Sequence, residues 1–113
     1  MNSRDKGKRS ELLISHKLQD YGFPARRTAQ YCGNSGDASD VVGLPGIHIE
    51  CKAQEQMRLY EWMEQAVRDA SAAGPVFPLP VVIHKRNKMD ILVTMRLDDW
   101  MTLYKSSIVS KGE

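Results

Sequence analysis

A chain of 113 residues supports one folded domain with one hydrophobic core, and a formal net charge of +2 is too small to identify a nucleic-acid partner by itself. Its two cysteines, Cys32 and Cys51, have no motif spacing, so a reducing cytoplasm is a more natural setting than a disulfide-bonded secreted protein. No apolar run approaches membrane-spanning length, and the N-terminus lacks the apolar segment of a secretion signal.

The first predicted element is a helix, which follows a loose polar arm over residues 1–5. The helix begins between Lys6 and Ser10 and ends at Tyr21, because Gly22 is a typical C-terminal stop. A partial apolar stripe on this helix indicates that one side packs against the rest of the domain.

A strand is predicted next, over residues 23–29, and it contains Arg26 and Arg27. Adjacent residues of a strand face opposite sides, so at most one of these arginines can face a given site. Residues 30–38 are rich in Gly, Asn, Ser and Asp, which is typical of a loop. Loops beside a rigid scaffold often carry binding residues, although most are connectors.

The segment from Asp40 to Lys52 is predicted to form a β-hairpin. Residues 40–42 and 47–52 are the strands, and Leu44-Pro45-Gly46 is the turn. Because side chains alternate along a strand, residues 47–52 divide into two faces. The polar face carries His48, Glu50 and Lys52, and the face expected to pack in the core carries Ile47, Ile49 and Cys51.

A hairpin centred on Pro45 places Asp40 opposite Glu50, with their Cβ atoms about 4.5–5.5 Å apart. Two carboxylates at this distance repel each other unless a cation lies between them. Converging carboxylate oxygens suit Mg²⁺ or Mn²⁺. A shift of register by one residue would turn Asp40 to the other face, and Asp37 is a competing acid. Asp40 is favoured over Asp37 because the following strand residues hold it in place.

A second helix follows the hairpin, and it ends at Gly74-Pro75. Its apolar residues recur at helical spacing at Leu59, Trp62, Met63, Ala66, Val67 and Ala70. Two further strands are predicted over residues 80–85 and 91–95, joined by a polar turn. A short last helix ends at Tyr104, with Trp100 and Leu103 packed inward, and residues 105–113 are expected to be a weakly ordered tail.

The predicted order of elements is therefore α-β-β-β-α-β-β-α, within one domain over residues 1–113. Local hairpins combined with one crossover helix indicate an α/β fold, with a mixed central sheet flanked by helices.

Asp40 followed by Glu50-Cys51-Lys52 resembles the PD-(D/E)XK nuclease signature, with Ser39 in the position of its proline. A helix that starts with Lys-Gly-Lys-Arg-Ser-Glu over residues 6–11 and a following helix with Gln65 extend the likeness. This order is similar to that of archaeal-type Holliday junction resolvases and small phage nucleases, over roughly residues 6–104. The resemblance implies a restriction-endonuclease-like core.

The resemblance also implies the roles of the site residues. Asp40 and Glu50 would hold Mg²⁺ or Mn²⁺ together with the backbone carbonyl of Cys51, and Lys52 would orient or deprotonate the attacking water. Glu11 would be a third acidic group at the metal, and Gln65 would lie near the site. The residues alone leave simpler alternatives open. Glu11 could be an acid near a helix N-terminus, Gln65 a solvated side chain, and Glu50 and Lys52 a solvent-facing pair on a half-exposed strand.

The expected function is that of a Mg²⁺-dependent DNA endonuclease that cuts branched DNA as a homodimer in the cytoplasm of a bacterial, archaeal or phage-infected cell. One alternative is the same fold acting on flaps, nicks or duplex DNA in replication, repair or restriction, and another is a non-catalytic DNA-binding module. The expected dimer contacts are Met57, Leu59, Tyr60, Trp62 and Met63, although each of them could instead pack under the sheet. DNA contacts are expected from the basic residues Lys6, Lys8, Arg9, Arg26 and Arg27.

Overall fold

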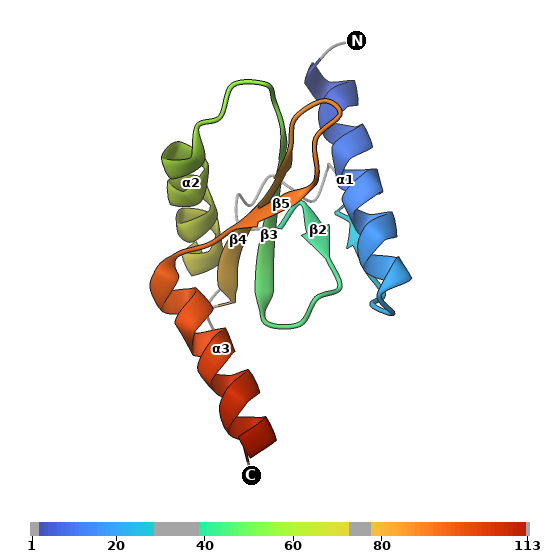
Figure 1. The fold of residues 1–113 in the computed structure, drawn as a ribbon. Coiled ribbons are helices and arrows are strands. Elements are labelled where there is room, and N and C mark those ends of the chain that lie inside the picture. The colour runs from blue at the N-terminus through green and yellow to red at the C-terminus, as the bar shows by residue number, and fades with distance from the viewer. Residues whose placement is uncertain (1–2, 29–38, 73–77, 113) are drawn as a thin grey trace.

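The computed structural model describes residues 3–28, 39–72 and 78–112, and it has the predicted order of helices and strands. Figure 1 shows the sheet between two helices, with a third helix extending away from it. The elements are α1 (Ser3–Asp20), β1 (Arg26–Arg27), β2 (Val41–Val42), β3 (Ile47–Ala53), α2 (Leu59–Ala72), β4 (Leu79–Lys85), β5 (Leu92–Thr94) and α3 (Leu97–Gly112). The α/β class is therefore confirmed.

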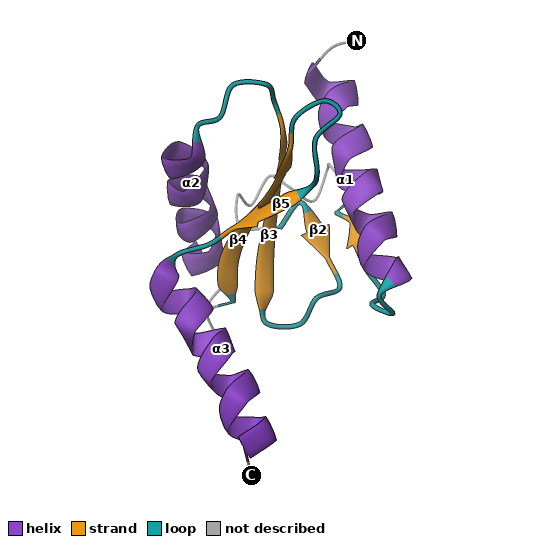
Figure 2. Cartoon of the chain, viewed as in Figure 1, coloured by secondary structure: helices purple, strands orange, loops and turns teal. Residues whose placement is uncertain are grey.

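The five strands form one mixed sheet in the order β1-β2-β3-β4-β5 (Figure 2). Neighbouring strands are antiparallel except for β3 and β4, which are parallel and are connected through α2. A parallel pair requires such a crossover, because a tight turn can join only antiparallel neighbours. The longest strands, β3 and β4, lie at the centre of the sheet.

The hairpin of β2 and β3 has the predicted register at its centre, where Val41 pairs with Ile49. The N–H of Ile47 donates to the carbonyl of Leu44 at 3.1 Å, which closes the predicted turn. Gly43 has a φ of 111°, and a Cβ at this position would collide with the backbone of Pro24 and Ala25. Glycine is therefore required where the hairpin crosses the segment leading into β1.

Helices cover both faces of β3, and each makes its own apolar cluster. On one face, Ile14 of α1 packs with Ile49 and Cys51, so the predicted core face of β3 is confirmed. On the other face, Trp62, Met63 and Ala66 of α2 pack with Val82 of β4. The alternative that this second face is half-exposed is wrong, because α2 buries it. A strand covered on both sides cannot present solvent-facing side chains at its centre.

α1 begins at Ser3, so the expected loose arm is wrong for residues 3–5. Asp5 lies in the first turn, where a carboxylate stabilises the helix N-terminus, and the polar composition that indicated coil is therefore compatible with a helix. The C-terminal end is close to the prediction, since α1 ends at Asp20 and Gly22 has a φ of 96°. Tyr21 is exposed and does not join the apolar stripe.

The expected tail over residues 105–113 is also wrong, because α3 continues through it to Gly112. Trp100 and Leu103, which were expected to pack inward, are 49% and 41% exposed. Trp100 instead stacks on Tyr104 one turn further along α3, with the ring centroids 5.6 Å apart. Such contacts within one helix stabilise it without tertiary packing. No helix in the described part of the chain has the length and apolar character of a membrane span.

Candidate active site

Asp40 lies directly before β2, in a local departure from the regular ladder. Its backbone N–H donates to the carbonyl of Ile49 at 2.8 Å, although Ile49 already pairs with Val41. Two successive residues of one strand therefore face one residue of the other, which is the arrangement of a β-bulge. Bulges re-aim side chains and are common next to active sites. Asp40 is consequently turned out of simple opposition to Glu50.

The Asp40 carboxylate reaches the backbone of β3 beyond the end of β2. Its Oδ2 accepts a hydrogen bond from the N–H of Cys51 at 2.8 Å. In an antiparallel pair the N–H and the C=O of one residue point toward the same neighbour. The carbonyl of Cys51 therefore faces the same side as the Asp40 carboxylate, where the resemblance places it as a donor.

Glu50 lies deep in the site, with 2% of its surface exposed. Its Oε1 is 2.9 Å from Nε2 of His48. Burial is the main reason that the pKa of the Glu50 carboxyl is raised to about 7, and the bond from His48 opposes this shift. The charge of Asp40 and a hydrogen bond with Asp69 of α2 raise this pKa further. Glu50 is therefore a buried carboxyl held close to two others.

The donor atoms around Glu50 fit a divalent cation. His48, Glu50 and Asp69 each offer one ligand atom, and these atoms lie within 4.8 Å of one another. Carboxylate and carbonyl oxygens suit Mg²⁺ and Mn²⁺. A cation would also relieve the repulsion among acids that are close enough to raise each other's pKa. The geometry thus groups Glu50 with His48 and Asp69, and it places Asp40 close enough to raise the pKa of Glu50.

Glu11 of α1 approaches Asp40 from the face of the sheet opposite α2. Burial and the nearby charge of Asp40 raise the pKa of the Glu11 carboxyl. Nε of Arg27 donates to Oε1 of Glu11 at 3.0 Å, and this contact opposes the shift. Glu11 lies more than two turns into α1, so a role as an N-terminal helix acid does not explain it. As expected from alternation along a strand, Arg27 faces the site and Arg26 is exposed.

Lys52 and Gln65 also meet at the site. Nζ of Lys52 donates to Oε1 of Gln65 at 3.2 Å, and both side chains are half-buried. Gln65 is therefore not a freely solvated helix residue, and the alternative of a solvent-facing pair of Glu50 and Lys52 is wrong. α2 covers this face of β3 and supplies the partner that holds the ammonium group.

Three side chains at the site were given no role in the sequence analysis: Ser39, His48 and Asp69. Asp69 follows Gln65 by one helical turn, so it shares the side of α2 that faces β3. His48 was placed on the face of Glu50 but was given no role. Among the expected DNA contacts on α1, Lys8 and Arg9 are exposed and Lys6 is half-buried. The competing acid Asp37 and the second cysteine, Cys32, lie outside the described residues.

Replacing Glu50 by Gln should stabilise the metal-free protein at pH 8. The pKa of Glu50 is raised in the fold, so the protonated carboxyl contributes stability that is fully present below pH 4.5, the usual pKa. This contribution is lost as the pH rises through about 7. Gln keeps the shape without the charge, so the free energy of unfolding should rise by roughly 1–3 kcal/mol. Thermal unfolding in chelator measures this, with Glu64→Gln, an exposed position on α2, as the control.

This stabilisation should shrink at pH 5, where the wild-type Glu50 is itself protonated in the fold. A Glu50→Gln variant that melts below the wild type at pH 8 in chelator would contradict the buried, repelled carboxyl described above.

Comparison with known proteins identifies the class of this fold and site. Residues 2–111 match the family described as "Phage putative PDDEXK endonuclease", which is nearly the whole chain. The protein therefore belongs to this family of PDDEXK endonucleases.

Among solved structures, the chain is similar to Hjc, a Holliday junction resolvase from the archaeal hyperthermophile Archaeoglobus fulgidus. The two share 25% sequence identity with a TM-score of 0.58, over 80% of this chain and 72% of Hjc. This likeness confirms the restriction-endonuclease-like core. No curated protein matches the chain.

Proposed function

We propose that this protein is a metal-dependent DNA endonuclease of the resolvase type, which hydrolyses phosphodiester bonds in branched DNA, and that residues 1–113 form one nuclease domain. The main support is the convergence of Asp40, Glu50 and the paired Lys52 and Gln65 on one end of the β2–β3 hairpin. The family match supports the nuclease activity, and the likeness to Hjc supports a branched substrate.

Each site residue has a part in the proposed hydrolysis. Asp40, Glu50 and the Cys51 carbonyl would hold Mg²⁺ or Mn²⁺, with Glu11 as a further acid. The bound metal would neutralise charge on the scissile phosphate and support the leaving oxygen. Lys52 would orient the attacking water or stabilise the developing phosphate charge. The hydrogen bond to Gln65 fixes the Lys52 ammonium group, so that less order has to be gained when DNA binds.

The substrate is tested by incubating the protein and Mg²⁺ with a synthetic four-way junction, a flap and a linear duplex in parallel. We expect the junction to be cut fastest, at symmetry-related positions. Preferred cutting of the flap or duplex would favour the alternative nuclease function. Tight junction binding without any cutting, in Mg²⁺ or Mn²⁺, would favour a non-catalytic DNA-binding module.

Exposed basic residues on α1 are proposed to contact DNA phosphates. Removing Lys8 and Arg9 together by alanine substitution should weaken junction binding and reduce the slope of log affinity against log salt by roughly 0.9 for each lost duplex phosphate contact. Fluorescence anisotropy over a salt series measures both quantities. Lys17→Ala, at the other end of α1, is the control. An unchanged slope in the double variant would remove this cluster from the DNA-binding surface.

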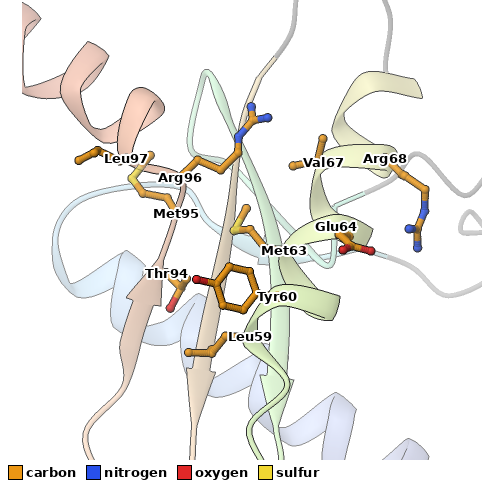
Figure 3. A pocket seen from close by; sticks show the side chains of 10 residues that line it. All are labelled: Leu59, Tyr60, Met63, Glu64, Val67, Arg68, Thr94, Met95, Arg96 and Leu97. Atoms are coloured by element: carbon orange, nitrogen blue, oxygen red, sulfur yellow. The ribbon is translucent and has the colours of Figure 1, made fainter.

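We also propose that two copies assemble as a homodimer through an apolar groove between α2 and the β5–α3 segment. Figure 3 shows Tyr60 and Met63 of α2 on one side of this groove and Met95 and Leu97 on the other. The groove has a volume of about 730 Å³. Trp62, which was expected to contribute to a dimer, is 5% exposed and belongs to the core.

The exposed apolar surface beside the groove is large enough for a stable dimer. Its large side chains are between 41% and 88% exposed, at Tyr60, Leu97, Trp100, Leu103, Tyr104 and Ile108. A wholly buried aromatic side chain covers about 150–250 Å², and about half or more of each aromatic ring here is open to a partner. With the aliphatic side chains, two copies would bury roughly 1,000 Å² in total, which is about the minimum for a specific interface. A two-fold arrangement would place two identical sites on opposed strands.

Sedimentation equilibrium at micromolar concentration should therefore give twice the chain mass of 12.8 kDa. Replacing Tyr60 by Lys should shift the protein toward monomer, because a charge would be buried in the apolar contact. Tyr21→Lys is the matched control, since Tyr21 is 79% exposed on α1 and lies outside the groove. A wild-type mass near 12.8 kDa that junction DNA does not change would exclude the dimer.

A further inference from the structure

Ser39 occupies the position of the proline in the nuclease signature, and the structure gives its side chain a partner. Oγ of Ser39 lies 3.2 Å from Nδ1 of His48. The other ring nitrogen of His48, Nε2, lies 2.9 Å from Oε1 of Glu50. One imidazole ring therefore connects the residue before Asp40 to the second predicted metal ligand.

The direction of these hydrogen bonds follows from the chemistry of their ends. An ionised Glu50 can only accept, so Nε2 of His48 must carry the hydrogen toward it. In the neutral ring, Nδ1 is then an acceptor, and the hydroxyl of Ser39 is the group that donates to it. His48 is 1% exposed and Glu50 is 2% exposed, so water does not readily substitute for the contact between them.

We propose that Ser39 and His48 are positioning residues that hold the Glu50 carboxylate for metal binding. This inference rests on the proposed function, in which Glu50 is a metal ligand. The ring fixes Oε1 of Glu50 from one side, so the orientation of the carboxylate is set before the metal arrives. Hydrogen bonds that orient ligand groups commonly change metal affinity by 10–100-fold.

The pair also explains why a serine stands at position 39. Proline has no side-chain hydroxyl, so the signature residue would leave Nδ1 of His48 without this partner in a buried place. The two roles are therefore linked: the Ser39 hydroxyl orients the His48 ring, and the ring orients the Glu50 carboxylate.

The inference is tested with Mn²⁺ alone, by measuring its dissociation constant from the loss of the free-ion EPR signal. Ser39→Ala should weaken Mn²⁺ binding by about tenfold, and Ser39→Thr, which keeps the hydroxyl, should restore it to within about twofold. His48→Gln should weaken binding at least as much as Ser39→Ala. Adding Ser39→Ala to His48→Gln should cause little further loss, because the serine acts through the ring.

Thr94→Ala is the matched control. Oγ1 of Thr94 lies 2.8 Å from Nε2 of His84, which is another buried histidine on the sheet. This substitution removes a hydroxyl from a buried imidazole that has no hydrogen bond to Glu50 among the described residues. It should lower the melting temperature about as much as Ser39→Ala and leave the Mn²⁺ affinity unchanged.

Two results would overturn the positioning role: Mn²⁺ affinity in Ser39→Ala equal to that of the wild type, or the same loss in Thr94→Ala as in Ser39→Ala. In either case the wild type still binds Mn²⁺, so the proposed metal-dependent function survives. A wild-type protein that does not bind Mn²⁺ would instead overturn the proposed function and the positioning role together. Single-turnover cleavage adds a second readout, since Ser39→Ala should slow the cutting step without weakening DNA binding.

Discussion

An Asp40→Asn variant should cut junction DNA at least a thousandfold more slowly than the wild type while it folds and binds DNA normally. The Asn side-chain oxygen can still accept the hydrogen bond from the Cys51 N–H that Asp40 accepts at 2.8 Å. The local backbone should therefore survive. What is lost is the negative charge that the proposed metal site requires. A thousandfold change in rate corresponds to about 4 kcal/mol of transition-state stabilisation.

Single-turnover cleavage measures the rate, anisotropy measures DNA affinity, and circular dichroism measures the fold. Glu50→Gln should behave in the same way. Asp20→Asn, at the exposed C-terminal end of α1, controls for the loss of one negative charge from the protein as a whole. More than a tenth of the wild-type rate in Asp40→Asn would mean that Asp40 is not a metal ligand, and the acids that remain close to Glu50 would have to be reconsidered.

The sequence predicts the scaffold of the site because the hairpin depends on local signals. Alternation of apolar and polar residues over 47–52, with a turn centred on Pro45, fixes the pairing of Val41 with Ile49. The bulge at Asp40 is not predictable in this way. It arises from a backbone hydrogen bond to Ile49, and no residue type in the hairpin demands it.

The burial of Glu50 depends on a long-range contact, which explains why the sequence left a half-exposed face open as an alternative. The hydrophobic pattern identifies the apolar side of α2 through Trp62, Met63 and Ala66. It does not indicate that the edge of this side carries Asp69 toward Glu50. Periodicity reports which residues avoid water, and it is silent about which polar groups meet across two elements.

The third helix shows the opposite limitation. Trp100 and Leu103 were assigned to the core because large apolar residues are usually buried. In the monomer they are 49% and 41% exposed, on a helix that leaves the body of the domain. The pattern identifies the apolar residues correctly, but a single sequence does not show whether the chain itself covers them.

Removing divalent metal should abolish DNA cleavage completely, and adding Mg²⁺ or Mn²⁺ should restore it. In the site the carboxyl groups of Asp40 and Asp69 lie close enough to Glu50 to raise its pKa. A DNA phosphate entering such a site without a cation would meet only further negative charge, and attack on phosphorus would be opposed.

The experiment compares cleavage in EDTA with cleavage in EDTA saturated by excess Mg²⁺, so that the chelator itself is present in both samples. Lys52→Gln separates the two parts of the site, because it should keep metal binding and still lose about 10²–10⁴-fold in rate. Circular dichroism in EDTA should show an intact fold, since the two apolar clusters that pack α1 and α2 against the sheet contain no proposed metal ligand other than the buried Cys51. Cleavage that continues unchanged in chelator would leave the proposed hydrolysis without its charge-neutralising group, and the acidic cluster would then have to be purely structural.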